Sequence, residues 1–363
     1  MDTIPKRMKA VFLKGHGGFD QLEYRDDVPV PLPRPEEVLI HVGAAGVNNT
    51  DINTRTAWYS KGVTEGTTPD GGKSGYAQAK ADDTGWTGSA LAFPRIQGAD
   101  ACGRIVAVGK HVDLARVGER ILVEPVLRQP VGWRPYEALY FGSECDGGFA
   151  EYAKVPAVHA HKIDSQLSDA ELASFPCSYS AAENMLTRSG LRAEETVLIT
   201  GASGGVGSAA VQLASRRGAV VVAVTSAPKA NLVRALGADR TVLRQDNLVN
   251  ALGKETVDVV IDVVGGSQWP ELLELLKRGG RYAAAGAIAG PLVTLDLRTL
   301  YLKDLSLLGC TILDREVFGN LVGYIERGEI RPVVAKTFPM KDIVRAQQEF
   351  LSKQFVGKIV LVP

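Results

Sequence analysis

The chain has 363 residues, 45% of them apolar and 23% charged, which is ordinary for a globular protein and long enough for two domains. Lys plus Arg and Asp plus Glu number 41 each, so no overall field attracts nucleic acid or an anionic membrane. No stretch reaches the roughly 18 uncharged apolar residues of a membrane span, and the first residues lack the apolar run of a signal peptide, so we expect a cytoplasmic protein without nucleic-acid or membrane partners.

The first part of the chain is predicted to be rich in β-strands. Residues 8–13 and 37–47 have strand composition, and the second of these leads to a polar turn at Asn48-Asn49-Thr50-Asp51. Two further candidate strands follow at 103–109 and 119–124. Because no helical pattern alternates with them, they predict a compact, barrel-like domain.

An unusual segment, Ser60 to Pro94, interrupts this region. It is rich in Gly, Thr, Asp and Lys, which makes it too polar to bury and too long for a routine connection. Such a segment is either a functional lid or a partly disordered loop. We favour a lid, because the residues on either side of it are candidates for the active site.

From Asp169 to Thr187 the residues are good helix formers with amphipathic spacing, which predicts a helix. It leads to VLITGASGGVG at 197–207, where an apolar strand meets a glycine-rich turn and then a helix. In a dinucleotide-binding unit such a turn lets backbone N–H groups approach a pyrophosphate, and the helix N-terminus faces the phosphates. The residues predicted to contact the cofactor here are Ala202, Ser203, Gly204, Gly205, Val206 and Gly207.

The elements after this turn support a nucleotide-binding fold. A second strand is predicted at 219–224, a helix at 229–236 and a third strand at 257–264, which together give the order βαβαβ. A tight turn without a ligand is the bland alternative, and this order argues against it. The chain is therefore predicted to be α/β, with a doubly wound parallel sheet of the Rossmann type.

The cofactor type is predicted from the end of the second strand. Enzymes that select NAD usually place Asp or Glu there, whereas this chain has Thr225, Ser226 and then Lys229. A hydroxyl and an ammonium group can hold a 2′-phosphate, so Ser226 and Lys229 predict NADPH. The alternative is that Lys229 is an ordinary solvated lysine at the start of a helix.

The last part of the chain is predicted to hold helices at 316–327 and 341–351 and a closing strand from Gly357 to Val362. Four motifs in this order, PRPEEVLIHVGAAGVNNTDIN, QGADACGRIVAVG, ASGGVG and FVGKIVLVP, resemble the medium-chain dehydrogenase/reductase superfamily, in particular its zinc-independent quinone oxidoreductase-like branch. The resemblance spans nearly the whole chain.

This resemblance implies a division into domains and an assembly. It implies a GroES-like catalytic domain over residues 1–165 and 310–363, and a Rossmann NADP-binding domain over residues 166–309. It also implies a homodimer or homotetramer, often built by pairing edge strands of the Rossmann sheet, for which residues 305–312 are the candidate.

The chain departs from the zinc-dependent members of this superfamily. Where those proteins have a Cys ligand and a His-Glu pair, this chain has Asn48, and Ala99 with Asp100; only Cys177 matches the third ligand. One thiolate with an amide and a methyl group cannot make a tetrahedral site, so no catalytic metal is expected. His159 and His161 have strand spacing, but they lack a visible third ligand and are better explained as a polar pair.

Without a metal, other groups must polarise the substrate oxygen. The resemblance implies that Asn48 orients substrate or nicotinamide, and that Tyr59 donates a hydrogen bond or proton to the substrate oxygen. Asp51 matches the next polar position of the motif, although it can equally cap the turn. Tyr59 can equally be an ordinary packing residue.

These observations leave more than one class of function. The first is a zinc-independent, NADPH-dependent reductase that transfers hydride to a quinone or an α,β-unsaturated carbonyl compound. The second is a non-enzymatic relative that binds NADPH. The third, a zinc-dependent alcohol dehydrogenase, is disfavoured by the missing ligands. The intact glycine turn, Lys229 and Tyr59 favour the enzyme with a small-molecule substrate.

Overall fold

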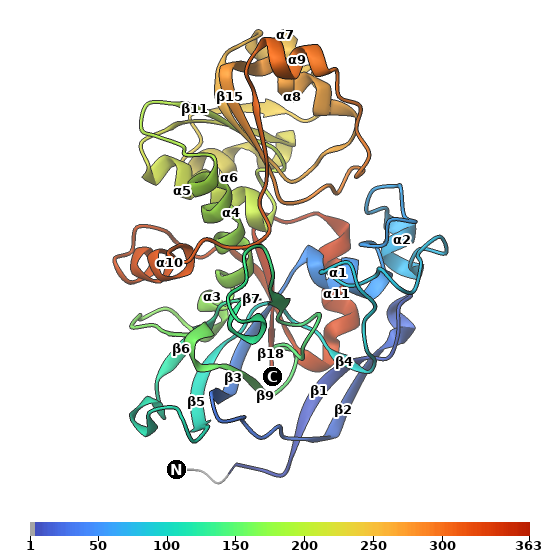
Figure 1. Ribbon diagram of the computed structural model, residues 1–363, viewed down its shortest axis with the longest axis vertical. Coiled ribbons are helices and arrows are strands. Elements are labelled where there is room, and N and C mark those ends of the chain that lie inside the picture. The colour runs from blue at the N-terminus through green and yellow to red at the C-terminus, as the bar shows by residue number, and fades with distance from the viewer. Residues whose placement is uncertain (1–3) are drawn as a thin grey trace.

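A six-stranded parallel sheet forms the upper part of the molecule in Figure 1, which shows a computed structural model describing residues 4–363. In spatial order its strands are β13 (Arg240–Leu243), β12 (Val220–Thr225), β11 (Thr196–Ile199), β14 (Val257–Asp262), β15 (Leu276–Ala284) and β16 (Ser306–Gly309). The predicted doubly wound α/β sheet is thereby confirmed. Strand order reverses at β11, so the ligand crevice of such a fold lies at the carboxyl ends of β11 and its neighbours.

One strand of this sheet was missed in the sequence. We predicted the third strand at 257–264, but β13 and the helix α7 (Leu248–Leu252) lie between β12 and that segment, which is therefore the fourth strand. The physical reason is that β13 is short and lies at the sheet edge, where only Val242 of its residues is buried. An edge strand of this kind lacks the apolar run on which the prediction relied.

Helices cover both faces of the sheet, as expected for connections between parallel strands. They are α5 (Gly205–Arg216), α6 (Ala230–Ala235), α7, α8 (Trp269–Leu275) and α9 (Leu297–Leu302). A further helix, α4 (Pro176–Arg188), packs on α5, and α10 (Val317–Glu326) packs on α4.

The predicted helix over 169–187 is interrupted. The structure has a short α3 (Asp169–Leu172), a break, and then α4, which begins at Pro176. Proline lacks a backbone N–H and is favoured in the first turn of a helix, so it starts a new helix here rather than continuing the old one. Cys177 and Ser178 consequently lie in the first turn of α4.

A second sheet occupies the lower part of the molecule and joins distant parts of the chain. In spatial order its strands are β10 (Ala160–Lys162), β6 (Arg120–Val123), β5 (Cys102–Val108), β3 (Glu37–Val47), β18 (Lys358–Val362) and β17 (Val334–Pro339), with β9 (Tyr152–Pro156) also on β3. The last strand of the chain therefore completes a sheet begun near the N-terminus, next to α11 (Ile343–Ser352). The exact domain boundaries stay a prediction.

The remaining strands form two small sheets. One contains β2 (Leu22–Pro29), β1 (Arg7–Leu13) and β4 (Arg95–Ile96), and the other pairs β7 (Val126–Leu127) with β8 (Leu139–Tyr140). The helix α1 (Asn49–Thr56) follows β3 directly.

Residues 60–94, called the insertion below, form an ordered part of this structure. They contain a short helix, α2 (Pro69–Ser74), and bury Val63, Tyr76 and Thr84 despite their polar composition. Two side chains outside the insertion hold it in place: the buried Arg55 guanidinium donates to Gly72 O at 2.6 Å, and the half-buried His16 has its Nε2 2.7 Å from Thr84 Oγ1. The expectation that the segment was too polar to bury is therefore wrong for these residues, because side chains outside the insertion hydrogen-bond its carbonyl and hydroxyl groups, whereas most of the segment is exposed or half-buried.

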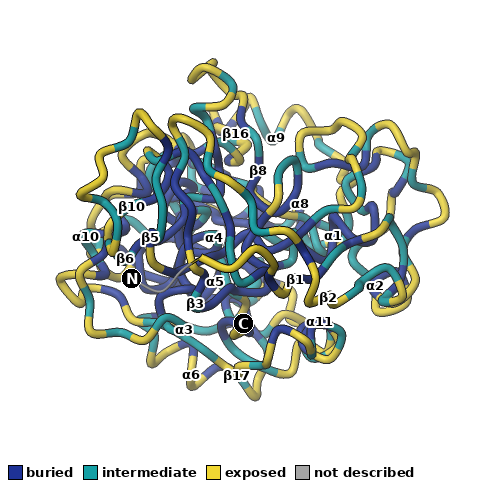
Figure 2. The backbone as a smooth tube through the Cα atoms, turned by 90° about the horizontal axis from the view of Figure 1, so that it is seen from below, coloured by how far each residue is buried: buried dark blue, intermediate teal, exposed yellow. Residues whose placement is uncertain are grey.

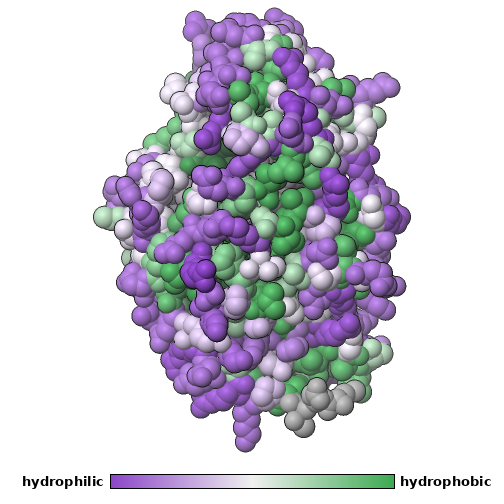
Figure 3. Space-filling model, turned by 180° about the vertical axis from the view of Figure 1, so that it is seen from behind, coloured by the Kyte–Doolittle hydropathy of each residue, from purple (hydrophilic) through white to green (hydrophobic). Residues whose placement is uncertain are grey.

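The core follows the sheets. Buried chain runs through the middle of the molecule in Figure 2, and exposed chain forms its loops. On the face shown in Figure 3, apolar side chains interrupt an otherwise hydrophilic surface. Among residues 4–363 no helix is long and apolar enough to cross a membrane.

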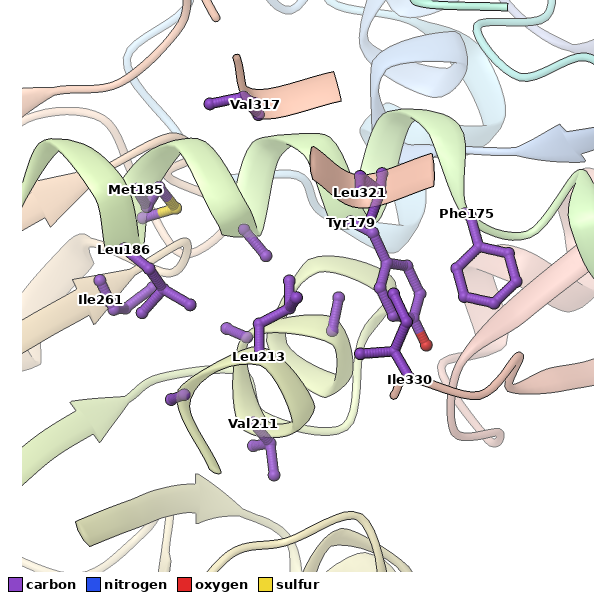
Figure 4. Close-up of a cluster of buried hydrophobic side chains, with 14 of the residues drawn as sticks. Phe175, Tyr179, Met185, Leu186, Val211, Leu213, Ile261, Val317, Leu321 and Ile330 are labelled. Atoms are coloured by element: carbon purple, nitrogen blue, oxygen red, sulfur yellow. The ribbon is translucent and has the colours of Figure 1, made fainter. Parts of the chain in front are cut away.

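The packing of α4 on α5 places the first turns of both helices together. Figure 4 shows Tyr179 and Leu186 of α4 pointing towards Leu213 of α5, with Leu321 of α10 above. Tyr179 also donates to Arg331 O at 2.7 Å, so its buried hydroxyl is satisfied. This apolar contact positions Cys177 and Ser178 relative to the glycine turn.

Candidate active site between the two sheets

The glycine turn has the geometry that a dinucleotide requires. Gly201 has φ 56°, and a methyl group on Gly207 would lie 2.2 Å from Gly201 O. Gly204 caps α5, while a methyl group on Gly205 would lie 2.6 Å from Ser178 Oγ. The N-terminus of α5 therefore presents its first backbone N–H groups at the end of β11, where an anionic group can bind.

Polar groups at the carboxyl end of β12 have few hydrogen-bond partners. Thr225 Oγ1 is buried without a hydrogen-bond partner, and Ser226 follows it. Lys229 Nζ donates only to Lys353 O, at 2.5 Å. Partial burial, and then the positive charge of Arg244, lower the pKa of Lys229. This concentration of uncompensated donors fits an anionic group such as a 2′-phosphate.

Arg244 and Lys353 were missed in the sequence. Arg244 follows β13, and its backbone N–H donates to Thr225 O at 2.9 Å, so the residue lies beside the end of β12. It was missed because β13 itself was not recognised. Lys353 directly follows α11 in the lower part of the molecule, and nothing in its local sequence links it to Lys229.

The region below the turn contains a fully buried ionic cluster. Asn48 Nδ2 donates to Asp100 Oδ2 at 2.7 Å, Lys358 Nζ donates to the same oxygen at 2.7 Å, and Lys358 also donates to Asn48 Oδ1. The side chains of Lys358 and Asp100 are 3% and 0% exposed. We call Asn48, Asp100 and Lys358 the buried triad. Its members satisfy one another, so the Asn48 amide is held rather than offered to a ligand.

Asp51 is bound equally firmly. Its carboxylate accepts from Asn48 N at 2.7 Å and from Gly98 N at 3.2 Å, which caps α1. Burial raises the pKa of Asp51 to about 7, although these N–H groups and the nearby Lys358 oppose the shift. The geometry thus gives Asp51 the capping role that we considered as its alternative.

Tyr59 lies beside the start of α1 and α4. Its hydroxyl donates to Thr50 Oγ1 at 2.9 Å. It is close enough to Cys177 and Asp51 for their charges to affect it, and burial raises the pKa of Tyr59 above its ordinary range. The tyrosine remains a neutral hydrogen-bond donor at neutral pH.

Tyr140 is another aromatic residue at this place, and no motif of the sequence pointed to it. Its hydroxyl lies 3.0 Å from Cys177 Sγ. Trp86 of the insertion stacks on the Tyr140 ring, with centroids 4.5 Å apart and planes 29° apart. The insertion also reaches the upper sheet, since Thr67 N donates to Ile288 O at 2.8 Å. It therefore lies against both sides of the candidate site.

The residues at the zinc-ligand positions of related enzymes do not fit that metal. The Asn48 amide is hydrogen-bonded to Asp100 and Lys358, and Ala99 has only a methyl group. Burial raises the pKa of the Cys177 thiol to about 12, so the thiol stays protonated. His159 and His161 both hydrogen-bond Glu124 Oε2, at 2.8 and 3.1 Å, so they form the expected polar pair. Within residues 4–363 no cluster of His, Cys, Asp and Glu could hold a metal ion.

Comparison with known proteins agrees with this architecture. Residues 34–165 match the family described as the alcohol dehydrogenase GroES-like domain, and residues 205–327 match the zinc-binding dehydrogenase family. An acryloyl-coenzyme A reductase of Metallosphaera sedula is 31% identical over 98% of this chain and 99% of its own length. The chain belongs to the medium-chain dehydrogenase/reductase superfamily.

Other members are similar over their full length. A quinone oxidoreductase of Lama guanicoe is 27% identical over 100% of this chain and 99% of its own. A Sinorhizobium meliloti structure, provisionally assigned as an alcohol dehydrogenase, is 46% identical with a TM-score of 0.87, covering 100% of this chain and 98% of that one. This medium-chain dehydrogenase/reductase is accordingly an oxidoreductase of a family that uses nicotinamide cofactors.

Proposed function

We propose that the protein is a zinc-independent, NADPH-dependent reductase that transfers hydride to an α,β-unsaturated carbonyl compound or a quinone. The observation that carries this proposal is the buried triad. It replaces metal-binding groups with a self-satisfied hydrogen-bond cluster, so the site must stabilise a substrate oxygen through side-chain donors. The names of the acryloyl-coenzyme A and quinone reductases among its relatives support the same substrate chemistry.

The cofactor part of the proposal rests on the strand ends. The turn from Ala202 to Gly207 would hold the pyrophosphate of NADPH, and Ser226 with Lys229 would hold its 2′-phosphate. Arg244 adds a positive charge at the same place. When bound, NADPH would supply a hydride to the β-carbon of a conjugated carbonyl compound or to the ring of a quinone.

The chain's own residues then complete the reaction. A hydroxyl near the start of α4 stabilises the developing enolate oxygen, and water supplies the proton that the α-carbon gains. The insertion, which reaches Ile288 across the site, limits access of bulk water.

The test is NADPH oxidation measured with a panel of quinones, enones, enoyl thioesters, aldehydes and ketones, together with elemental analysis of the purified protein. We expect turnover of quinones or conjugated carbonyl compounds, with activity retained in a strong chelator. One tightly bound zinc per chain, lost together with activity on simple aldehydes or ketones, would instead establish the zinc-dependent alcohol dehydrogenase.

We also propose that the protein forms a homodimer or homotetramer through β16. This strand lies at the edge of the upper sheet, and large apolar side chains close to it in the sequence are exposed: Leu292, Leu297, Tyr301, Leu302 and Leu307. An unpaired edge beside exposed apolar groups favours association. Light scattering should show an oligomer that Leu307→Lys weakens, with Leu114→Lys, which changes an exposed leucine elsewhere, as its control.

A further inference from the structure

We propose that Tyr140 is a catalytic residue, which donates a hydrogen bond from its hydroxyl to the oxygen of the reacting substrate while Cys177 serves as its partner in the free enzyme. This inference rests on the reductase function proposed above. It names the donor that a site without a metal requires. Neither the motifs of the chain nor the resemblance of its sequence identified this residue.

The position of Tyr140 follows from a short series of contacts. Its hydroxyl meets Cys177 Sγ, and the next residue, Ser178, adjoins Gly205 in the cofactor turn. Tyr140 also lies close enough to Tyr59 and Asp100 for their charges to affect it. The buried hydroxyl therefore lies at the first turn of α4, which adjoins the cofactor turn at the start of α5, and close to Asp100 of the buried triad.

The Tyr140 hydroxyl can exchange its present partner, the Cys177 thiol, for a substrate oxygen. A thiol is both a weak donor and a weak acceptor, and whichever atom donates, the O···S contact at 3.0 Å is a weak hydrogen bond. A substrate oxygen that gains negative charge is a much stronger acceptor. Exchanging the thiol for this oxygen therefore gains free energy as charge develops, which is the property required of an oxyanion donor.

Tyr59 differs in this respect. Its hydroxyl already donates to Thr50 Oγ1 at 2.9 Å, an ordinary oxygen acceptor, so donating to substrate would break a better hydrogen bond. Both tyrosines stay protonated, since burial raises the pKa of each above its ordinary range. The two tyrosines differ in the strength of the hydrogen bond that each hydroxyl must break before it can donate to the substrate.

The insertion fixes the ring of Tyr140. Trp86 stacks on it at 4.5 Å between centroids, and Tyr140 N–H donates to Glu144 Oε2 at 3.1 Å. The same carboxylate group accepts from Thr87 N at 3.0 Å, which ties the insertion to the strand that carries Tyr140. Trp86 is thereby a positioning residue for the donor.

The experiment compares Tyr140→Phe with Tyr59→Phe on the panel substrate that the wild-type enzyme reduces best. Removing one oxyanion donor costs about 10²- to 10³-fold in kcat, so we expect Tyr140→Phe to lower kcat by about 100-fold with KM and the Kd of NADPH nearly unchanged. Tyr59→Phe should lower kcat less than about 10-fold. Phenylalanine keeps the stacking on Trp86, so thermal unfolding should not change.

A further pair of variants separates the donor from the residue that positions it. Trp86→Ala should lower kcat, and Trp86→Phe should restore most of it by rebuilding the aromatic stack. The exposed Tyr136→Phe serves as the control for an unrelated tyrosine.

The outcomes distinguish this inference from the function on which it depends. If the wild-type enzyme reduces a panel substrate and Tyr140→Phe retains wild-type kcat, the Tyr140 role is wrong while the reductase function stands. A large loss in Tyr59→Phe alone would assign the donor to Tyr59. If wild-type protein reduces no member of the panel, both proposals fail together.

Discussion

The polar groups on the two sides of the crevice differ in how completely they are hydrogen-bonded. Below the glycine turn, Asn48, Asp100 and Lys358 are fully buried and satisfy one another. At the end of β12, Thr225 Oγ1 has no partner and the Lys229 ammonium has one carbonyl. A polar residue of a motif can therefore serve either the fold or a ligand, and its existing hydrogen bonds distinguish the two roles.

The largest effect is expected from a variant that breaks the buried triad. Lys358→Met leaves the Asp100 carboxylate buried without its countercharge, which should lower the free energy of unfolding by about 3–5 kcal/mol in urea denaturation. The double variant Lys358→Met with Asp100→Asn removes both charges and should recover much of this loss. If the double variant is no more stable than the single one, the pair does not act as a balanced unit.

The next effect concerns Asp51, whose pKa is about 7 in the folded protein against 3.8 for an ordinary carboxyl group. Between these values the folded state keeps a proton that the unfolded state has released, so the free energy of unfolding falls as pH rises from about 4 to 7. Asp51→Asn should remove this contribution. Urea denaturation across that window should show wild-type stability declining relative to the variant, and a constant difference would contradict the shift.

A smaller effect is expected from Arg244→Ala, at the carboxyl end of β12. Losing one of the charges near a 2′-phosphate should weaken NADPH binding by roughly tenfold and leave NADH binding unchanged. Arg240→Ala is the matched control, because Arg240 begins the same strand, β13, and so lies at the opposite end of that strand from Arg244. Isothermal titration of each variant with both cofactors measures the difference, and equal losses for NADPH and NADH would remove Arg244 from the phosphate site.

The smallest effect concerns the contact between the insertion and the upper sheet. Thr67→Pro removes the N–H that donates to Ile288 O, while Thr64→Pro changes an exposed threonine nearby. We expect a few-fold loss in kcat/KM for the first variant and almost none for the second, since a single hydrogen bond contributes about 1 kcal/mol. Identical kinetics in both variants would show that this contact does not limit access to the site.

Much of the fold could be predicted from the sequence, because its signals are local. The glycine turn at 201–207 follows an apolar strand and opens a helix, and that pattern alone identifies the cofactor edge. The edge strand β13 lacked such a pattern, and Arg244 was missed with it. The role of Pro176 was visible in principle, because a proline within a helical pattern usually marks a helix end or start.

The active-site residues could be predicted only in part. Asn48 and Asp51 were selected from their motif, but whether an amide or carboxylate faces a ligand depends on partners far away in sequence, such as Lys358. Tyr140 had no signal, since its closeness to Cys177 arises from packing between distant segments. The predicted catalytic roles of Asn48, Asp51 and Tyr59 therefore depend on kinetics of their variants.

The most direct test of the contrast between the two sides is a fluorescence titration of NADPH and NADH with the wild-type protein and Lys229→Ala. We predict that the wild-type protein prefers NADPH by about one to two orders of magnitude. Lys229→Ala should lose most of this preference, while Lys254→Ala, which changes an exposed lysine paired with Glu274, should retain it. Equal wild-type affinities for the two cofactors, or an unchanged preference in Lys229→Ala, would contradict the account.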